Sequence, residues 1–469
     1  MSSTDAAVPA RNVVRSRPWY SPPPSPVVWG LWAVALVSIL AFIVHEGRNV
    51  PFEEDWLMVA PMTGHEADLP AWLWSQNSEH RLPLPRLVNL TLLRATGDFR
   101  STMVFDALIL GAVAAGMILV ARGLRGGRTH MADAFFPLLL LHLGNWDNLV
   151  WGWQIQFVLP TVLACALLLV IVARPASSTP VIAAVGASAL VCLPLSGANG
   201  LVLTPPLAAW FAYQARARTG ELHDWRRWLP AAAAGLAVLL CAVYFIGYQS
   251  SPWNTASPGP GTTLATFGKF LALGLGPVAK VSWIVFGAAA VLILGAAAAV
   301  LVMSLRDRNG HRDRIRSIGL LTFLAATVLL AFLVGWGRAG RAAETGRMPP
   351  RYVLLAAPGM CAAYFAFLLH GRWGLRRFGP AALALLVAFL FPLNTYLGLD
   401  RRDWFGAGME AFERDLAAGA SAEELARRHH EFMLHWDEEL MVVSLRQLHE
   451  AGIGPFADWQ PDPPEAPEP

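Results

Sequence analysis

Charge is scarce in this chain of 469 residues. Asp, Glu, Lys and Arg make up 15% of the residues, whereas hydrophobic residues make up 55%. A soluble protein of this length carries about 25% charged residues. The apolar residues gather in runs of about 17–22, the length that crosses a hydrocarbon layer as a helix. The composition therefore excludes an ordinary soluble protein and predicts an all-α, polytopic transmembrane bundle.

Lysine and cysteine are also rare. The only lysines are Lys269 and Lys280, so nearly all basic residues are arginines. Arginine beside membrane spans is explained by topology, and the net charge of +3 therefore predicts no nucleic-acid partner. The cysteines all fall inside apolar runs, where they predict neither disulfides nor a metal–thiolate site. They are Cys165, Cys192, Cys241 and Cys361.

Several signatures of soluble enzymes are missing as well. The chain has no P-loop, no GxSxG, no HExxH and no CxxC in a useful context. We therefore expect no soluble nucleotide-binding domain. A cytoplasmic reaction driven by ATP or by a nucleotide sugar is disfavoured.

The apolar runs predict about eleven spans, with the N-terminus inside and the C-terminus outside. Arginines at 11, 15 and 17 precede the first run, which places the N-terminus in the cytoplasm. Arg-rich loops at 122–128, 214–227, 306–316 and 371–377 then fall on the same side. The predicted spans are 28–46, 102–121, 131–144, 155–173, 180–196, 200–214, 229–248, 282–303, 317–336, 352–369 and 380–396.

This alternation requires that residues 263–280 do not cross the membrane. The stretch holds both lysines and several glycines, and we interpret it as an interfacial or re-entrant helix on the outer side. The domain prediction has three parts: a disordered cytoplasmic segment at 1–27, a transmembrane domain at 28–396 with an outer loop at 47–100, and an extracytoplasmic helical tail at 397–469.

The tail contains two amphipathic stretches, at 405–418 and 421–450. Ser421 and Glu424 form a capping-box pattern at the start of the second. Histidines at 429, 430 and 435 invite a metal interpretation, but their spacing does not put three ligands on one helical face. We therefore expect an exposed amphipathic helix there.

Three consecutive acids, Glu53, Glu54 and Asp55, follow the first span. A carboxylate at a membrane face is partly desolvated, which raises its pKa and makes it a better base near neutral pH. The alternative is a solvated loop with ordinary acids, and we favour that alternative for Glu53. Asp55 or Glu54 is the predicted catalytic carboxylate.

Three polar clusters offer donors and acceptors for a substrate. They are a loop at 76–81, the stretch 145–156 and the turn 196–200. The alternatives are a polar loop leading into a span, interhelical hydrogen bonds, and a turn that needs Asn and Gly for its backbone angles. The candidate substrate-binding residues are Glu79, His80, Arg81, Asp147, Asn148, Gln154 and Asn199.

A cationic loop at 337–351 falls on the outer side, against the usual charge rule. Arginine forks bind phosphate bidentately, so a phosphate at the membrane surface explains the loop. The alternative is that the predicted topology is wrong at this point. The candidate phosphate-binding residues are Arg338, Arg341, Arg347, Arg351, Tyr352 and Lys269.

Over residues 28–396 the layout resembles the GT-C superfamily of integral-membrane glycosyltransferases. The resemblance rests on a first span followed by EEDW at 53–56 and EHRLPLPRL at 79–87. The polar turns NWDNLVWGWQ and GANG, and the late pair Arg351-Tyr352, add to it. The acidic motif departs from the family in being a triplet, and the tail is smaller than the outer domains of many members.

The resemblance implies a membrane glycosyltransferase that uses a polyprenyl-phosphate-linked sugar on the outer side of a bacterial inner membrane. The loop acid would act as base in an inverting transfer, and the arginines would stabilise the lipid phosphate. The partners are then a lipid-linked donor and membrane lipids. The sequence requires no cofactor, although a divalent metal is compatible with it. Sugar, acceptor, lipid carrier and oligomeric state stay open.

Two other functions compete with this interpretation. A transporter or flippase would place ionisable groups near the bilayer midplane, whereas here polar residues gather at one face. A non-catalytic subunit for envelope assembly would use the tail to bind a partner. An outer cavity that joins the acidic triplet to residues 338–352 favours the enzyme, and a central polar path favours transport.

Overall fold

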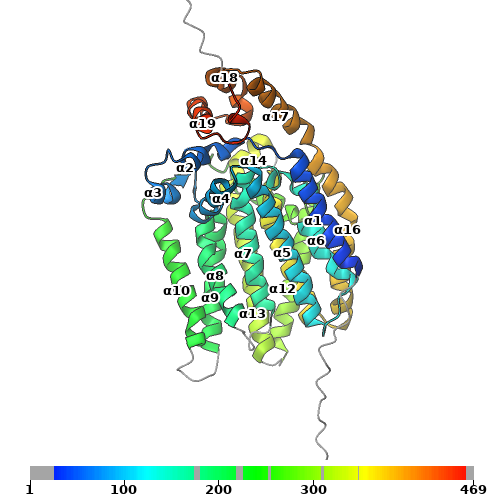
Figure 1. The fold of residues 1–469 in the computed structure, drawn as a ribbon. Coiled ribbons are helices and arrows are strands. Elements are labelled where there is room, and N and C mark those ends of the chain that lie inside the picture. The colour runs from blue at the N-terminus through cyan, green and yellow to red at the C-terminus, as the bar shows by residue number, and fades with distance from the viewer. Residues whose placement is uncertain are drawn as a thin grey trace, which may run out of the picture.

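Helices form almost the whole of the computed structural model (Figure 1). It describes residues 26–173, 180–217, 225–251, 255–307, 311–346 and 348–460. The strands that it contains are β1 (Gln76–Asn77) and β2 (His80–Arg81), which pair antiparallel. The all-α class is therefore confirmed. Most of the predicted disordered segment, residues 1–25, and the candidate Arg347 lie outside the described residues.

Seven helical segments in the described part of the chain are long and apolar enough to cross a membrane, which indicates a membrane protein. The predicted count of eleven spans stays a prediction. The seven segments are Pro26–Glu46 (α1), Arg100–Leu124 (α5), Gly152–Val172 (with α7, Ile155–Val172), Trp283–Arg306 (α12), Asp313–Gly337 (in α13, His311–Gly337), Pro350–His370 (with α15, Val353–His370) and Gly374–Ala417 (with α16, Trp373–Leu399).

Shorter helices fill the rest of the bundle. Three apolar helical segments, Met131–Leu140, Val181–Ser196 and Trp228–Tyr244, contain α6 (Phe135–Leu140), most of α8 (Pro180–Cys192) and most of α10 (Trp225–Tyr244). Helix α9 (Ala198–Ala217) contains the adjacent prolines Pro205 and Pro206 and packs against α10 and α13.

The predicted span at 131–144 is interrupted. The chain instead forms η2 (Met131–Ala134), α6, and η3 (Leu143–Asn148). Six residues of α-helix extend only about 9 Å, far less than the hydrocarbon thickness. The regular helix ends at Leu140, because Leu141 leaves the helical conformation (φ −116°, ψ 56°), and Asn145 inside η3 is non-helical again (φ −89°, ψ 18°). This break turns residues 145–148 into the interior at one end of the bundle.

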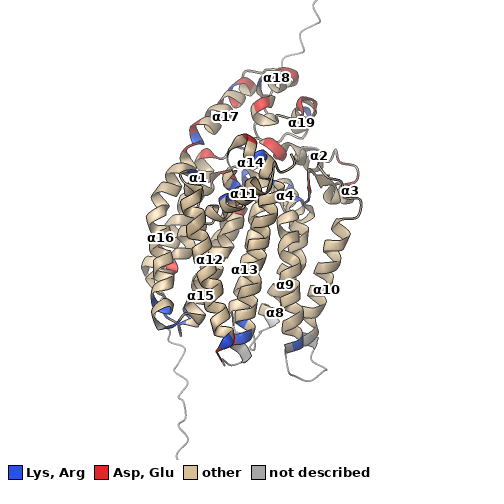
Figure 2. Ribbon diagram, turned by 180° about the vertical axis from the view of Figure 1, so that it is seen from behind, with Lys and Arg blue, Asp and Glu red and all other residues tan. Residues whose placement is uncertain are grey.

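The two ends of the bundle differ in charge. Charged residues at the end opposite the tail are mostly Lys and Arg, whereas the tail and the loops beneath it carry both basic residues and most of the Asp and Glu (Figure 2). By the positive-inside rule this distribution favours a cytoplasmic location for the end opposite the tail.

The predicted interfacial segment at 263–280 forms two pieces, α11 (Pro260–Leu273) and η6 (Pro277–Lys280). A turn at Gly274–Gly276 separates them, and Gly276 has a φ of 103°, which favours glycine. The Asn394 side chain of α16 holds this turn, because its Nδ2 donates to Leu275 O (2.9 Å) and its Oδ1 accepts from Val278 N (2.9 Å). The turn thereby fixes the backbone that carries Lys280.

The tail consists of α17 (Arg402–Ala417), α18 (Ala422–Met433) and α19 (Glu438–Glu450). The prediction of one helix over 421–450 was wrong, because the chain breaks at Leu434 and Asp437 caps a new helix through Leu440 N (2.8 Å). Ser421 caps α18 as predicted, through Glu424 N (3.2 Å).

The tail packs on the loop that follows α1. That loop contains η1 (Glu53–Met58), α2 (Val59–Thr63), α3 (Leu69–Trp74) and α4 (Pro83–Thr96). One hydrophobic cluster, separate from the core of the bundle, unites the loop with the tail. Its largest members include Phe52, Trp56, Trp151, Phe405 and Phe412. A roof of loop and tail therefore covers one end of the bundle.

Candidate functional site

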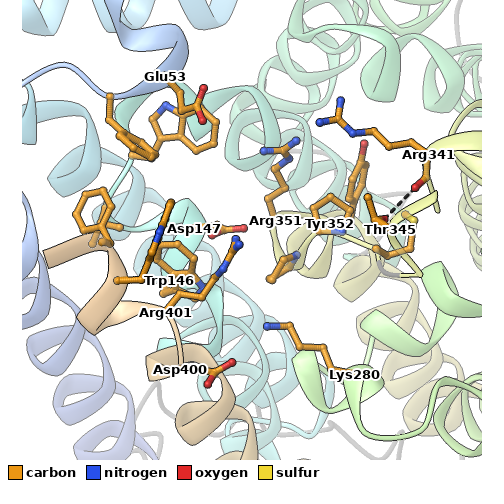
Figure 3. A pocket seen from close by; sticks show the side chains of 18 of the residues that line it. Glu53, Trp146, Asp147, Lys280, Arg341, Thr345, Arg351, Tyr352, Asp400 and Arg401 are labelled. Carbon is orange, nitrogen blue, oxygen red and sulfur yellow. Dashed lines mark hydrogen bonds between the residues drawn. The ribbon is translucent and has the colours of Figure 1, made fainter. Parts of the chain in front are cut away.

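A cavity of about 360 Å³ lies under this roof (Figure 3). Segments distant in sequence line it: η1, η3, the loop 338–352 with α14 (Ala339–Thr345) and η7 (Pro350–Tyr352), Lys280, and the junction between α16 and α17. The charged side chains that line the cavity are Glu53, Asp147, Lys280, Arg338, Arg341, Arg351, Asp400 and Arg401.

Glu53 is the member of the acidic triplet that lines the cavity. Its backbone has a φ of 50°, a conformation that costs a non-glycine residue about 1–3 kcal/mol and that packing must maintain. Burial raises the pKa of Glu53 to about 7, although Arg351 and Arg341 oppose the shift. A carboxyl group with this pKa is partly protonated and partly ionised near neutral pH, so it can act as a general base.

The predicted catalytic pair, Asp55 and Glu54, does not line the cavity. Asp55 is fully buried, and burial raises its pKa to about 8, opposed by backbone N–H groups of Phe52 and Trp153. Glu54 is half-buried, and burial again raises its pKa. Although the three acids are consecutive in the sequence, the turn of η1 directs Glu53 to the cavity and the other two away from it. Their catalytic role stays a prediction.

Asp147 supplies a second carboxylate from η3. It is buried in the cavity wall, and Figure 3 shows its carboxylate beside Arg351 and Arg401. Burial raises the pKa of Asp147, while Arg351, Arg401 and Lys280 lower it. The interrupted helix at 131–148 is what brings this predicted substrate-binding residue to the site.

The arginines of the cavity are in two different states. Arg338 is engaged, because its Nη2 lies 2.7 Å from Glu79 Oε1 and its Nε donates to Tyr352 Oη (3.0 Å). Arg351 lies over the Trp151 ring, at 5.6 Å from its centroid. Among the described residues, no carboxylate lies within 4.0 Å of the Arg341 or Arg351 guanidinium. Both are available for an anion.

A second cavity, of about 200 Å³, shares Arg338 and Tyr352 with the first. The predicted residues Glu79, His80 and Asn199 line it, together with apolar side chains of α9 and α13. Burial lowers the pKa of His80 to about 4, so this imidazole is neutral at neutral pH. The Glu79–Arg338 ion pair therefore lies in the partition between the two cavities.

Four of the predicted substrate- and phosphate-binding residues line neither cavity. Arg81 donates from its guanidinium to the carbonyls of Tyr244 (3.0 Å), Trp74 (2.7 Å) and Ile246 (2.9 Å), and so fastens the outer loop to α10. The other three are Asn148, whose Nδ2 donates to Arg351 O (3.2 Å), Lys269, whose Nζ donates to Gly346 O (3.1 Å), and Gln154, which is fully buried.

The prediction of site residues missed the contribution of the tail. Asp400, Arg401 and Trp404 line the cavity, and Lys280 does so in place of the predicted Lys269. A signal existed in the sequence: DRRDW at 400–404 places arginines just after the last span, on the side where the loop 337–351 was already unexpectedly basic.

Within the described residues, no group of three His, Cys, Asp or Glu side chains could hold a metal ion. Three carboxylates, four arginines and a lysine line the cavity, together with aromatic side chains. No family model, no curated protein and no solved structure matches the chain.

Proposed function

We propose that this protein is a glycosyltransferase. It moves a sugar from a polyprenyl-phosphate-linked donor to an acceptor of the cell envelope, at the outer face of a bacterial plasma membrane. The observation that carries the proposal is that the Glu53 carboxylate and the Arg341 and Arg351 guanidinium groups line one cavity. A base and an anion site must lie together for this reaction.

In the proposed reaction, Glu53 takes the proton of an acceptor hydroxyl. The oxygen attacks the anomeric carbon, and the bond from that carbon to the phosphate oxygen breaks with inversion. Arg351 and Arg341 stabilise the charge that develops on the leaving lipid phosphate, the larger part of the task because phosphate needs little acid assistance. Asp147 hydrogen-bonds sugar hydroxyls.

Glu53 takes the role for which Asp55 and Glu54 were predicted. Its side chain faces the cavity, and a pKa of about 7 suits a base that works near neutrality. Asp55 has no path to a substrate in this cavity because it is fully buried in the packed wall.

The second cavity suits the lipid part of the donor. It is mostly apolar, with side chains such as Leu330 and Leu333, and its polar end at Arg338 adjoins the first cavity. An amphipathic donor requires this combination of an apolar channel and a charged end.

The test uses a deletion strain complemented with the wild type, Glu53→Gln or Glu344→Gln. Glu344 is an exposed acid of α14 that does not line the cavity, so it is the matched control. Mass spectrometry of envelope glycans and lipids should show the product with the wild type and Glu344→Gln, and its loss with Glu53→Gln at equal expression. Full product with Glu53→Gln would remove Glu53 from the base role.

Transport of a lipid-linked glycan is a second candidate, favoured by Asp106. This carboxylate is buried in the span α5, and neither oxygen has a hydrogen-bond partner among the described residues. Ionisable residues inside spans often mark transport paths. Purified protein in liposomes decides between the two: transfer needs Glu53 and makes a new glycosidic bond, whereas transport needs Asp106 and leaves the lipid-linked glycan unchanged.

A further inference from the structure

We infer that the first turn of the tail builds a second phosphate site in the cavity, from Arg401, Lys280 and Trp404. The inference deepens the proposed function, because it states that the bound substrates carry two phosphates and not one. In Figure 3, Arg401 lies beside Asp147 and Lys280 lies below it, whereas Arg341 lies at the upper right.

The contrast between Arg401 and its neighbour Arg402 is the first argument. Arg402 is paired with acids, at 3.1 Å from Asp403 and 3.9 Å from Glu46. Arg401 instead lines the cavity, with its guanidinium 5.1 Å from the centre of the Trp404 ring. In the described part of the chain, no carboxylate lies within 4.0 Å of it. A stacked guanidinium with no acid within ion-pair distance is suited to a phosphate.

The charge of the cavity is the second argument. Five basic and three acidic side chains line it, and burial raises the pKa of both Glu53 and Asp147. The phosphodiester of a lipid-phosphate sugar carries a single negative charge. One such group at Arg341 and Arg351 leaves Arg401 without an anion from the substrate.

The third argument is that the fold holds this site in place. Lys280 follows the turn that Asn394 of α16 clamps from both sides. Arg401 follows the end of that same helix, α16, just before α17. A single helix therefore positions both cations, so that the site is built before any ligand arrives.

Two sources provide a second phosphate. It is either the second phosphate of a diphosphate-linked donor or a phosphate on the acceptor. In the first case both phosphates belong to one molecule, and in the second case they belong to two. The chemistry at Arg401 is the same, and the binding experiment separates the sources.

The experiment measures binding to the purified full-length protein in detergent, by the fluorescence of the tryptophans that line the cavity. The probes are farnesyl phosphate, farnesyl diphosphate and inorganic phosphate. The variants are Arg401→Gln, Arg341→Gln and, as matched control, Arg402→Gln. Thermal unfolding and Arg401→Lys check that lost binding does not reflect a damaged fold.

If the donor supplies the second phosphate, farnesyl diphosphate should bind about tenfold more tightly than farnesyl phosphate, the size expected for a charged hydrogen bond. Arg401→Gln should remove that difference, and Arg402→Gln should keep it. If the acceptor supplies it, the two farnesyl probes should bind alike, and inorganic phosphate should still bind to protein saturated with farnesyl phosphate. Arg401→Gln should then weaken the binding of inorganic phosphate about tenfold.

The inference is overturned if Arg401→Gln behaves like Arg402→Gln with every probe. It is also overturned if the wild type does not bind farnesyl diphosphate more tightly than farnesyl phosphate and, when saturated with farnesyl phosphate, binds no inorganic phosphate. A failure of the proposed function would give a different result. In that case farnesyl phosphate does not bind, or Arg341→Gln leaves its affinity unchanged. Even then, binding of inorganic phosphate that is lost in Arg401→Gln would support the second phosphate site.

Discussion

The Glu53 Oε2 atom lies 3.1 Å from Nδ1 of His435, although 382 residues separate the two in the sequence. Glu53 is mostly buried in the cavity wall, whereas the His435 side chain is 55% exposed. The contact joins the proposed base to the break between α18 and α19. It also helps to hold a backbone at Glu53 that its φ of 50° disfavours.

The rate of transfer should rise with pH through a midpoint of about 7. Glu53 acts only when deprotonated, and burial raises its pKa to about 7. The groups that face it are Arg341, Arg351, Glu54 and His435. The measurement is kcat/KM against pH with purified protein in nanodiscs. A rate that is flat between pH 5 and pH 9 would contradict the assignment.

His435→Ala should slow transfer several-fold and move the acidic limb of the pH profile upward. His435 Nδ1 lies 3.1 Å from Glu53 Oε2, and a hydrogen bond donated to the carboxylate favours its ionised form, which alanine cannot do. His45→Ala is the control, because His45 is exposed at the end of α1 and does not line the cavity. A purely structural role for His435 would lower the rate without moving the limb.

Arg351→Gln should reduce kcat by about 10²–10³-fold, the usual loss when one group that stabilises a developing oxyanion is removed. The same change should raise the pKa of Glu53, because Arg351 is the strongest of the groups that lower it. Arg351→Lys keeps the charge and should shift the pH profile less. The pH dependence of both variants separates the two effects, and an unchanged kcat in Arg351→Gln would place the leaving phosphate elsewhere.

Asp55→Asn should retain transfer and become stabilising as pH rises. The pKa of Asp55 in the folded protein is about 8, above its ordinary value of 3.8. The folded state therefore holds this proton more tightly, and the wild type loses stability as pH rises from about 4 to about 8. Asparagine does not titrate, so its unfolding temperature relative to the wild type should increase over that window. A variant that keeps its fold but loses transfer would return Asp55 to the catalytic role.

Hydropathy predicted the long helices because a spanning helix must be uniformly apolar, whatever its neighbours. The interruption at 131–148 escaped prediction because its residues are apolar enough to continue a span, and the kink at Asn145 depends on packing. The sequence favoured Asp55 or Glu54 over Glu53 as the acid of the site, whereas Glu53 is the one that lines the cavity, for a similar reason. A short 3₁₀ turn with a positive φ decides which way each acid points, and composition carries no signal for that.

The cationic loop illustrates what sequence reasoning can reach. Arginines on the side opposite to the usual charge rule indicated an anion site, and the structure brings Arg338, Arg341 and Arg351 to one cavity with Glu53. Arg401 was missed because it belongs to the tail, and only the tertiary fold brings the tail over the cavity. In both places the signal in the sequence is a group of arginines beside a predicted span, on the side where the charge rule does not expect them.

The hydrophobic cluster that the loop after α1 shares with the tail has a practical consequence. Each partner supplies only part of that apolar interior, with Phe52 and Trp56 on one side and Phe405 and Phe412 on the other. Residues 402–460 produced by themselves would leave these rings in water and should aggregate instead of forming a stable module. Truncating the chain after α16 should likewise destabilise the loop, because the loop after α1 and the tail stabilise each other.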